Sequence, residues 1–193
     1  MLFLAQERDA RLPAFLRCAL PFTAVNPYTP FQAGDVPVEM FFGRREMARE
    51  LQRPTGSCLV YGGRQLGKSA LLRHVQREFD NRDRQQYAWV EDIKAVGDSK
   101  AGQPDTSIIW RKLRDIFQHR FNLIKTRSDK PDEIERHIRR AMEEDAQRRV
   151  LIMFDEADNF LRADADEKFH IVDQLRTLMF VTERRFKVVF AGL

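Results

Sequence analysis

The segment Gly62-Gly-Arg-Gln-Leu-Gly-Lys-Ser69 decides the fold of this 193-residue chain. It satisfies the spacing G-x-x-x-x-G-K-[ST] at every position. A short apolar run over Cys58–Tyr61 precedes it, and apolar residues at helical spacing follow over 68–79. A strand, a glycine-rich loop and a helix in this order predict a phosphate-binding loop, because backbone N–H groups and the helix N-terminus then point at the anion.

Two side chains at the end of this segment have distinct predicted roles. Lys68 is a compact cation that can reach the β and γ phosphates, and we count it among the catalytic groups. Ser69 offers a hydroxyl to Mg²⁺. The predicted phosphate-contacting residues are Gly62, Gly63, Arg64, Gln65, Leu66, Gly67, Lys68, Ser69 and Ala70.

A second acidic motif, Asp155-Glu156, follows the apolar run Val150–Phe154. Continuous apolarity indicates a strand that is buried on both faces, as in a parallel sheet. A carboxylate at this position could also cap a helix or form an ion pair. Its occurrence together with the glycine-rich loop favours a role in metal binding and catalysis. We expect Asp155 to hold Mg²⁺ through its water shell and Glu156 to polarise an attacking water.

Strands and helices alternate along the chain, which predicts an α/β fold with a parallel sheet. The expected strands are Cys58–Tyr61, Gln86–Ile93, Val150–Phe154 and Lys187–Ala191. The expected helices cover 44–53, 68–79, 107–124, 132–147 and 164–182. Asp164 and Glu167 are spaced as a capping box at the start of the last helix.

Composition narrows the class of protein. Apolar residues make up 43%, charged residues 32%, and the net charge is +4, which is typical of a globular chain rather than a disordered one. There is no apolar run long enough for a membrane span. The two cysteines, Cys18 and Cys58, cannot form a disulfide framework, so we expect a cytoplasmic location.

Prolines divide the chain into two parts. Five of the eight lie between Pro13 and Pro37, and proline discourages regular structure. We therefore expect an N-terminal arm over residues 1–40 and a core domain over 41–193.

The two motifs together resemble the Walker A and Walker B motifs of P-loop ATPases of the additional-strand, catalytic-glutamate division. The segment Phe42-Gly43-Arg44 with Glu46 resembles an element found in AAA-related ATPases and in signal-transduction ATPases with numerous domains. The resemblance implies ATP as ligand, with Phe42, Gly43 and Arg44 near the adenine. It also implies a three-layer fold with strand order 5-1-4-3-2. The chain ends after the fourth strand, so we expect a truncated core without the fifth strand and the lid.

This resemblance implies a nucleotide-dependent switch that binds and hydrolyses Mg-ATP within a larger signalling or defence protein. It implies homo-oligomers or fused effector and sensor domains as partners. The main alternative is a DNA-handling ATPase adaptor for transposition or replication initiation. A small-molecule phosphotransferase and a nucleotide-free interaction module are further alternatives.

Several arginines have a sequence context that indicates a functional role less clearly. Arg184 and Arg185 fit either the last turn of a helix or a γ-phosphate contact. The basic clusters at 111–114, 136–140 and 148–149 are interleaved with acids, which is typical of a solvated helix face. Binding of a nucleic-acid backbone requires such clusters to converge on one side.

Overall fold

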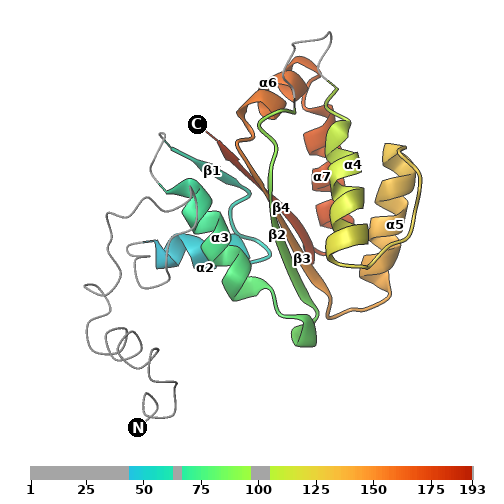
Figure 1. The fold of residues 1–193 in the computed structure, drawn as a ribbon, viewed down its shortest axis with the longest axis horizontal. Helices are drawn as coiled ribbons and strands as arrows, with labels where there is room; N and C mark the ends of the chain where they lie inside the picture. Colours follow the sequence, from blue (N-terminus) through green and yellow to red (C-terminus); the bar gives the residue numbers. More distant parts are fainter. Residues whose placement is uncertain (1–43, 63–66, 97–104, 193) are drawn as a thin grey trace, which may run out of the picture.

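Four parallel strands form the centre of the structure (Figure 1). The computed structural model describes residues 44–62, 67–96 and 105–192. The strands are β1 (Leu59–Tyr61), β2 (Gln86–Asp92), β3 (Arg149–Asp155) and β4 (Phe186–Gly192), and they lie in the order β1-β4-β3-β2. Every neighbouring pair is parallel. This confirms the expected order 1-4-3-2, and each predicted strand end is within one residue of the observed end.

Helices cover both faces of this sheet. They are α2 (Arg45–Gln52), α3 (Lys68–Phe79), α4 (Ile108–Asp115), α5 (Pro131–Glu143), α6 (Asp158–Asp166) and α7 (His170–Val181), with a 3-10 turn η3 (Arg82–Arg84) and a π-helical turn η4 (Ile116–Arg120). Helices α2 and α3 lie on one face, and α4, α5 and α7 lie on the other (Figure 1). The expected three-layer α/β fold is therefore confirmed.

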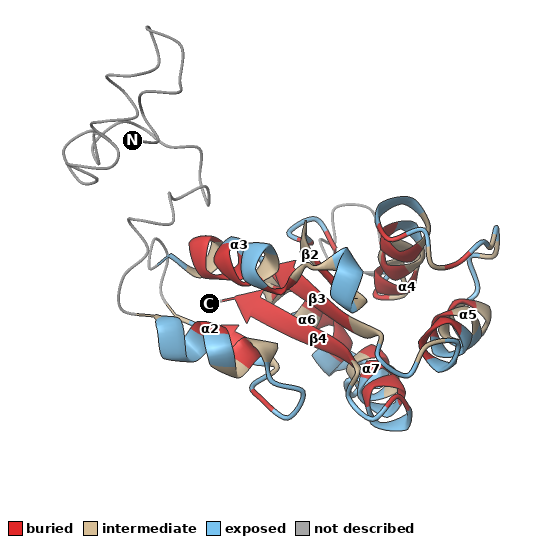
Figure 2. Ribbon diagram, turned by 90° about the horizontal axis from the view of Figure 1, so that it is seen from below, coloured by how far each residue is buried: buried red, intermediate tan, exposed pale blue. Residues whose placement is uncertain are grey.

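The alternation of side chains along β3 shows why the sheet needs two helical layers. Val150, Ile152 and Phe154 enter the larger core, which packs against α4 to α7. Leu151 and Met153 enter the smaller core under α2 and α3. All five are buried, and Figure 2 shows buried strands between helices whose outer faces are exposed. The continuous apolar run in the sequence thus reflects burial on both faces.

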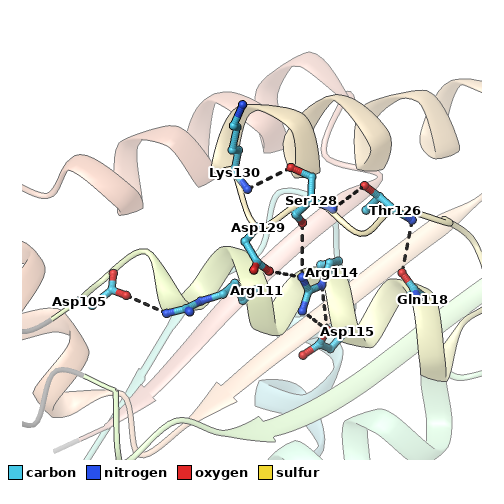
Figure 3. Close-up of polar contacts among 9 residues, drawn as sticks. All are labelled: Asp105, Arg111, Arg114, Asp115, Gln118, Thr126, Ser128, Asp129 and Lys130. Atoms are coloured by element: carbon cyan, nitrogen blue, oxygen red, sulfur yellow. Dashed lines mark hydrogen bonds and ion pairs between the residues drawn. The ribbon is translucent and has the colours of Figure 1, made fainter.

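One arginine fastens the long connection between η4 and α5 to the rest of the domain. Arg114 of α4 pairs with Asp115, 2.8 Å away, and with Asp129, and it donates to the carbonyl of Ser128 (Figure 3). The hydrogen bonds that Arg114 donates to Asp115 are the main reason that the pKa of Arg114 is raised. The connection is therefore held to α4 by charge-assisted contacts.

Three predicted helices differ from the observed ones. The helix expected over 107–124 ends as the π-helical turn η4, after which Asn122 takes a positive φ of 56°. The helix expected over 132–147 already ends at Glu143. The single helix expected over 164–182 is wrong, because α6 and α7 are separated where Lys168 and Phe169 both take positive φ.

Asp164 does cap a helix, but not as a capping box with Glu167. It lies in α6, is fully buried, and accepts hydrogen bonds from the backbone N–H groups of Ile171 (3.0 Å) and Val172 (2.9 Å) in the first turn of α7. Glu167 instead accepts from the hydroxyl of Thr106. A carboxylate from the preceding helix therefore satisfies two N-terminal donors of α7 and complements its dipole. Within the described ranges, no helix combines the length and the apolar character that crossing a bilayer requires.

Replacing this carboxylate should destabilise the domain. We expect Asp164→Ala to lower the free energy of unfolding by about 2 kcal/mol, because one buried and one partly buried N–H group lose a charged acceptor. Asp166→Ala is the matched control, since Asp166 lies in the same helix and is exposed. Urea unfolding followed by circular dichroism measures the difference. Equal stability of the two variants would contradict the capping role.

Candidate functional site

The glycine-rich segment joins the end of β1 to the start of α3. Gly67 has φ 75° and ψ 27°, a left-handed conformation that turns the chain into the helix. Helix α3 begins at Lys68, so Lys68, Ser69 and Ala70 supply its first backbone N–H groups. The Lys68 ammonium donates to the carbonyl of Gly62, 2.6 Å away. The lysine side chain therefore turns back to the residue that follows β1, at the positive end of the helix dipole.

Several predicted site residues fall outside the described part of the chain. They are Phe42, Gly43, Gly63, Arg64, Gln65 and Leu66, as is the expected arm over 1–40. Arg44 is described, and it stands at the N-cap of α2, where its carbonyl accepts from the N–H of Ala48.

The acidic pair lies at the carboxyl end of β3. Asp155 is 8% exposed, and its Oδ1 accepts from the N–H of Glu156 at 3.0 Å. Alternation along β3 places Asp155 on the same face of the sheet as Leu151 and Met153, which is the face covered by α3. The helix that carries Lys68 therefore lies on the side of the sheet to which Asp155 points.

Glu156 has an unusual backbone. Its φ is 54°, and its side chain is exposed. Seven described non-glycine residues have positive φ, and six of them follow helices, whereas Glu156 directly follows a strand. Hydrogen bonds on both sides hold this turn, since Ala157 N–H also donates to the carbonyl of Ala191 at 2.8 Å. A left-handed residue that the surrounding structure fixes in this way is frequent at functional sites.

The strand register brings the two motifs to the same edge of the sheet. Val60 of β1 pairs with Ala191 of β4, and Phe154 of β3 pairs with Phe190. Val60, Ala191 and Asp155 therefore lie in one row across three strands. Two inter-strand steps put the backbones of Val60 and Asp155 about 10 Å apart. The glycine-rich segment starts two residues beyond Val60 at this same edge.

A cavity of about 810 Å³ adjoins this edge, between α2 and β1. Its lining runs along α2, from Glu46 and Met47 in the first turn to Leu51 and Arg53 at the last, and along β1 to Tyr61, the last residue of that strand. Tyr61 is 79% exposed. The sequence analysis did not single out Tyr61 or Met47, because neither residue type nor spacing marks the wall of a cavity.

The two groups expected to hold Mg²⁺ are suited to that ion. The Ser69 hydroxyl and the Asp155 carboxylate are hard oxygen donors, and proteins commonly bind Mg²⁺ through one or two such groups together with phosphates and water. Among the described residues, no group of three or more histidine, cysteine, aspartate or glutamate side chains forms a metal cluster of its own.

Arg184 and Arg185 lie away from this edge. They precede β4, so the seven residues of that strand, about 20 Å in length, separate them from its carboxyl end. Arg185 donates to the carbonyls of Met142 and Asp145. Neither arginine can reach a phosphate at the glycine-rich loop of the same chain, and Arg185 holds the end of α5.

A family model described as "AAA domain" matches residues 51–193. No curated protein matches the chain.

The conformation of Gly67 leads to a local prediction. A Cβ at this position meets no atom within 4 Å, so the cost of a substitution comes from the backbone alone. We expect Gly67→Ala to lower the free energy of unfolding by about 1 kcal/mol, and Gly67→Asn to cost less, since asparagine tolerates positive φ. Urea unfolding of both variants tests this. A Gly67→Ala protein as stable as the wild type would contradict the left-handed turn.

Proposed function

The chain belongs to the AAA domain family of P-loop ATPases, and from this premise we propose that it binds Mg-ATP and hydrolyses it at the carboxyl edge of the sheet. One observation carries the proposal. Asp155 lies on the sheet face that α3 covers. It stands in one row with Val60, which precedes Tyr61 and the glycine-rich segment. The lysine and the carboxylate thus belong to the same edge and the same side of the sheet, as binding of a metal-bound polyphosphate requires.

Each residue of the loop has a part in binding the phosphates. The backbone N–H groups of Gly62 to Ala70 would surround the β-phosphate, and Lys68 would leave the Gly62 carbonyl for phosphate oxygens. Ser69 and Asp155 would hold Mg²⁺, which neutralises charge on the phosphates when bound. Phe42, Gly43 and Arg44 would lie near the adenine. The cavity of Met47 and Tyr61 would take the nucleoside, since its volume is in the range of small-molecule sites.

We assign the hydrolytic step to Glu156. Its carboxylate would accept a proton from a water whose oxygen attacks the γ-phosphorus as the bond to the β-phosphate oxygen breaks. Its position just after β3, its exposure and its fixed backbone support this role.

We further propose that the domain is a nucleotide-dependent switch of a larger signalling or defence protein, like the signal-transduction ATPases with numerous domains. Residues 1–40 would form an arm ahead of the core, the location would be cytoplasmic, and homo-oligomers or fused domains would be the partners. The alternative of a DNA-handling adaptor receives less support. The basic residues of the 111–114 and 136–140 clusters that pair with acids are Arg111, Lys112, Arg114, Arg139 and Arg140. Their charge is therefore largely balanced locally.

The first test is nucleotide binding. We expect Lys68→Ala to weaken binding of a fluorescent ATP analogue with Mg²⁺ by roughly 10- to 100-fold, since a charge-assisted hydrogen bond to phosphate is lost. Lys94→Ala is the control, because Lys94 is an exposed lysine just after β2. Titrations of both variants, each checked for folding by circular dichroism, measure the effect. Equal affinities would count against a phosphate site at Lys68.

The second test separates hydrolysis from binding. We expect Glu156→Gln to slow ATP hydrolysis by about 100-fold or more while it leaves ATP affinity unchanged within about twofold. Phosphate release under saturating Mg-ATP measures the rate. A variant that hydrolyses at the wild-type rate would show that another group activates the water.

A further inference from the structure

Two cations from neighbouring strands bind the last turn of α2. The Lys187 ammonium, on β4, donates to the carbonyls of Leu51 (2.9 Å) and Arg53 (2.7 Å). The Arg149 guanidinium, on β3, donates to the carbonyl of Gln52 at 2.7 Å. Three successive carbonyls at the negative end of α2 thus receive hydrogen bonds from positive groups.

These contacts lie inside the smaller core. Lys187 is 3% exposed, and the Arg149 guanidinium stacks 4.9 Å from the ring centroid of Phe79 in α3. Burial lowers the pKa of both groups below their ordinary values. The sequence analysis expected Arg149 on a solvated face, and this is wrong. An apolar side chain would fill such a position without the cost of desolvating a charge, so the cations fix the position of α2 rather than simply fill space.

The cavity proposed for the nucleoside extends along the whole of α2, since Leu51 and Arg53 at the last turn line it as well as residues of the first turn. Glu46 and Met47, in the first turn, line the cavity that Tyr61 also lines. The helix has only eight residues, and Ala48 and Leu51 pack into the smaller core between its two ends. A shift of its last turn therefore moves the wall of the cavity, because a short helix moves as a rigid body.

We propose that Lys187 and Arg149 are positioning residues that hold α2 so that its first turn recognises the nucleoside of ATP. The inference rests on the proposed function, and it concerns nucleoside recognition and not the phosphate loop. Lys187 is the second residue of β4, about 16 Å along the strand from the loop edge. The affinity for the nucleoside then depends on Lys187 and Arg149, although neither side chain contacts the nucleotide. The affinity for the phosphates does not depend on these two side chains.

The test compares two ligands, ATP and inorganic tripolyphosphate, each with Mg²⁺. We expect Lys187→Met to raise the Kd for ATP about tenfold, within the usual range of coupling between sites, and to change the Kd for tripolyphosphate by less than about twofold. Lys187→Arg keeps the charge and the donors, so it should recover most of the ATP affinity. Lys130→Met is the matched control, since the Lys130 side chain is 80% exposed. Isothermal titration calorimetry measures each Kd.

Folding is checked by urea unfolding of every variant. Arg149→Met carries the same comparison if Lys187→Met does not fold, because it removes a contact to the same helix turn. An equal loss of affinity for both ligands would show a general structural role and overturn the inference, as would unchanged affinity for ATP. Failure of the wild-type chain to bind tripolyphosphate through Lys68 would instead overturn the proposed function itself.

Discussion

Insertion of β4 between β1 and β3 is the constraint on which the rest of the structure depends. All seven residues of β4 are buried, and the strand pairs in parallel with both neighbours. Because it separates the two chemical motifs by one strand, it leaves a gap of about 10 Å between their backbones. That gap suits a metal-bound phosphate better than a direct contact between Lys68 and Asp155 would. The last strand of the described chain thus sets the spacing between the loop that follows the first strand and the carboxylate that ends the third.

The two faces of the sheet serve different purposes. The face under α4 to α7 is an apolar core rich in aromatic side chains, where Phe154 stacks on Phe190 at 5.6 Å between ring centroids. The face under α2 and α3 is smaller and contains both Asp155 and the buried cation Lys187. Charge is therefore concentrated on the face that carries the glycine-rich loop, at both ends of the strands. The hydrophobic contribution to the free energy of folding comes mainly from the first face, because its core is larger. The second face accommodates the charged groups on which the proposed ligand site depends.

The sequence predicted the strands well, because continuous apolar runs and one complete motif are local signals, whereas their order came from the resemblance to P-loop ATPases. It predicted helix ends less well. Asp164 has the residue type of a cap, but the helix that it caps starts six residues later at His170, and only the fold shows which donors it meets. The apolar strand expected over Lys187–Ala191 begins with a lysine. A lysine in such a run is the one sequence feature that indicates a buried cation. Its partners, the carbonyls at the end of α2, lie more than 130 positions away, where no sequence spacing connects them.

The central claim is that the glycine-rich loop and Asp155 form one Mg-nucleotide site. A crystal structure of the chain with Mg²⁺ and a non-hydrolysable ATP analogue tests it most directly. We expect electron density for the triphosphate along the Gly62–Ser69 backbone, with the Lys68 ammonium bound to phosphate oxygens instead of the Gly62 carbonyl. We also expect a metal ion between the Ser69 hydroxyl and the Asp155 carboxylate. A triphosphate bound elsewhere, or a metal with no link to Ser69 and Asp155, would contradict the account.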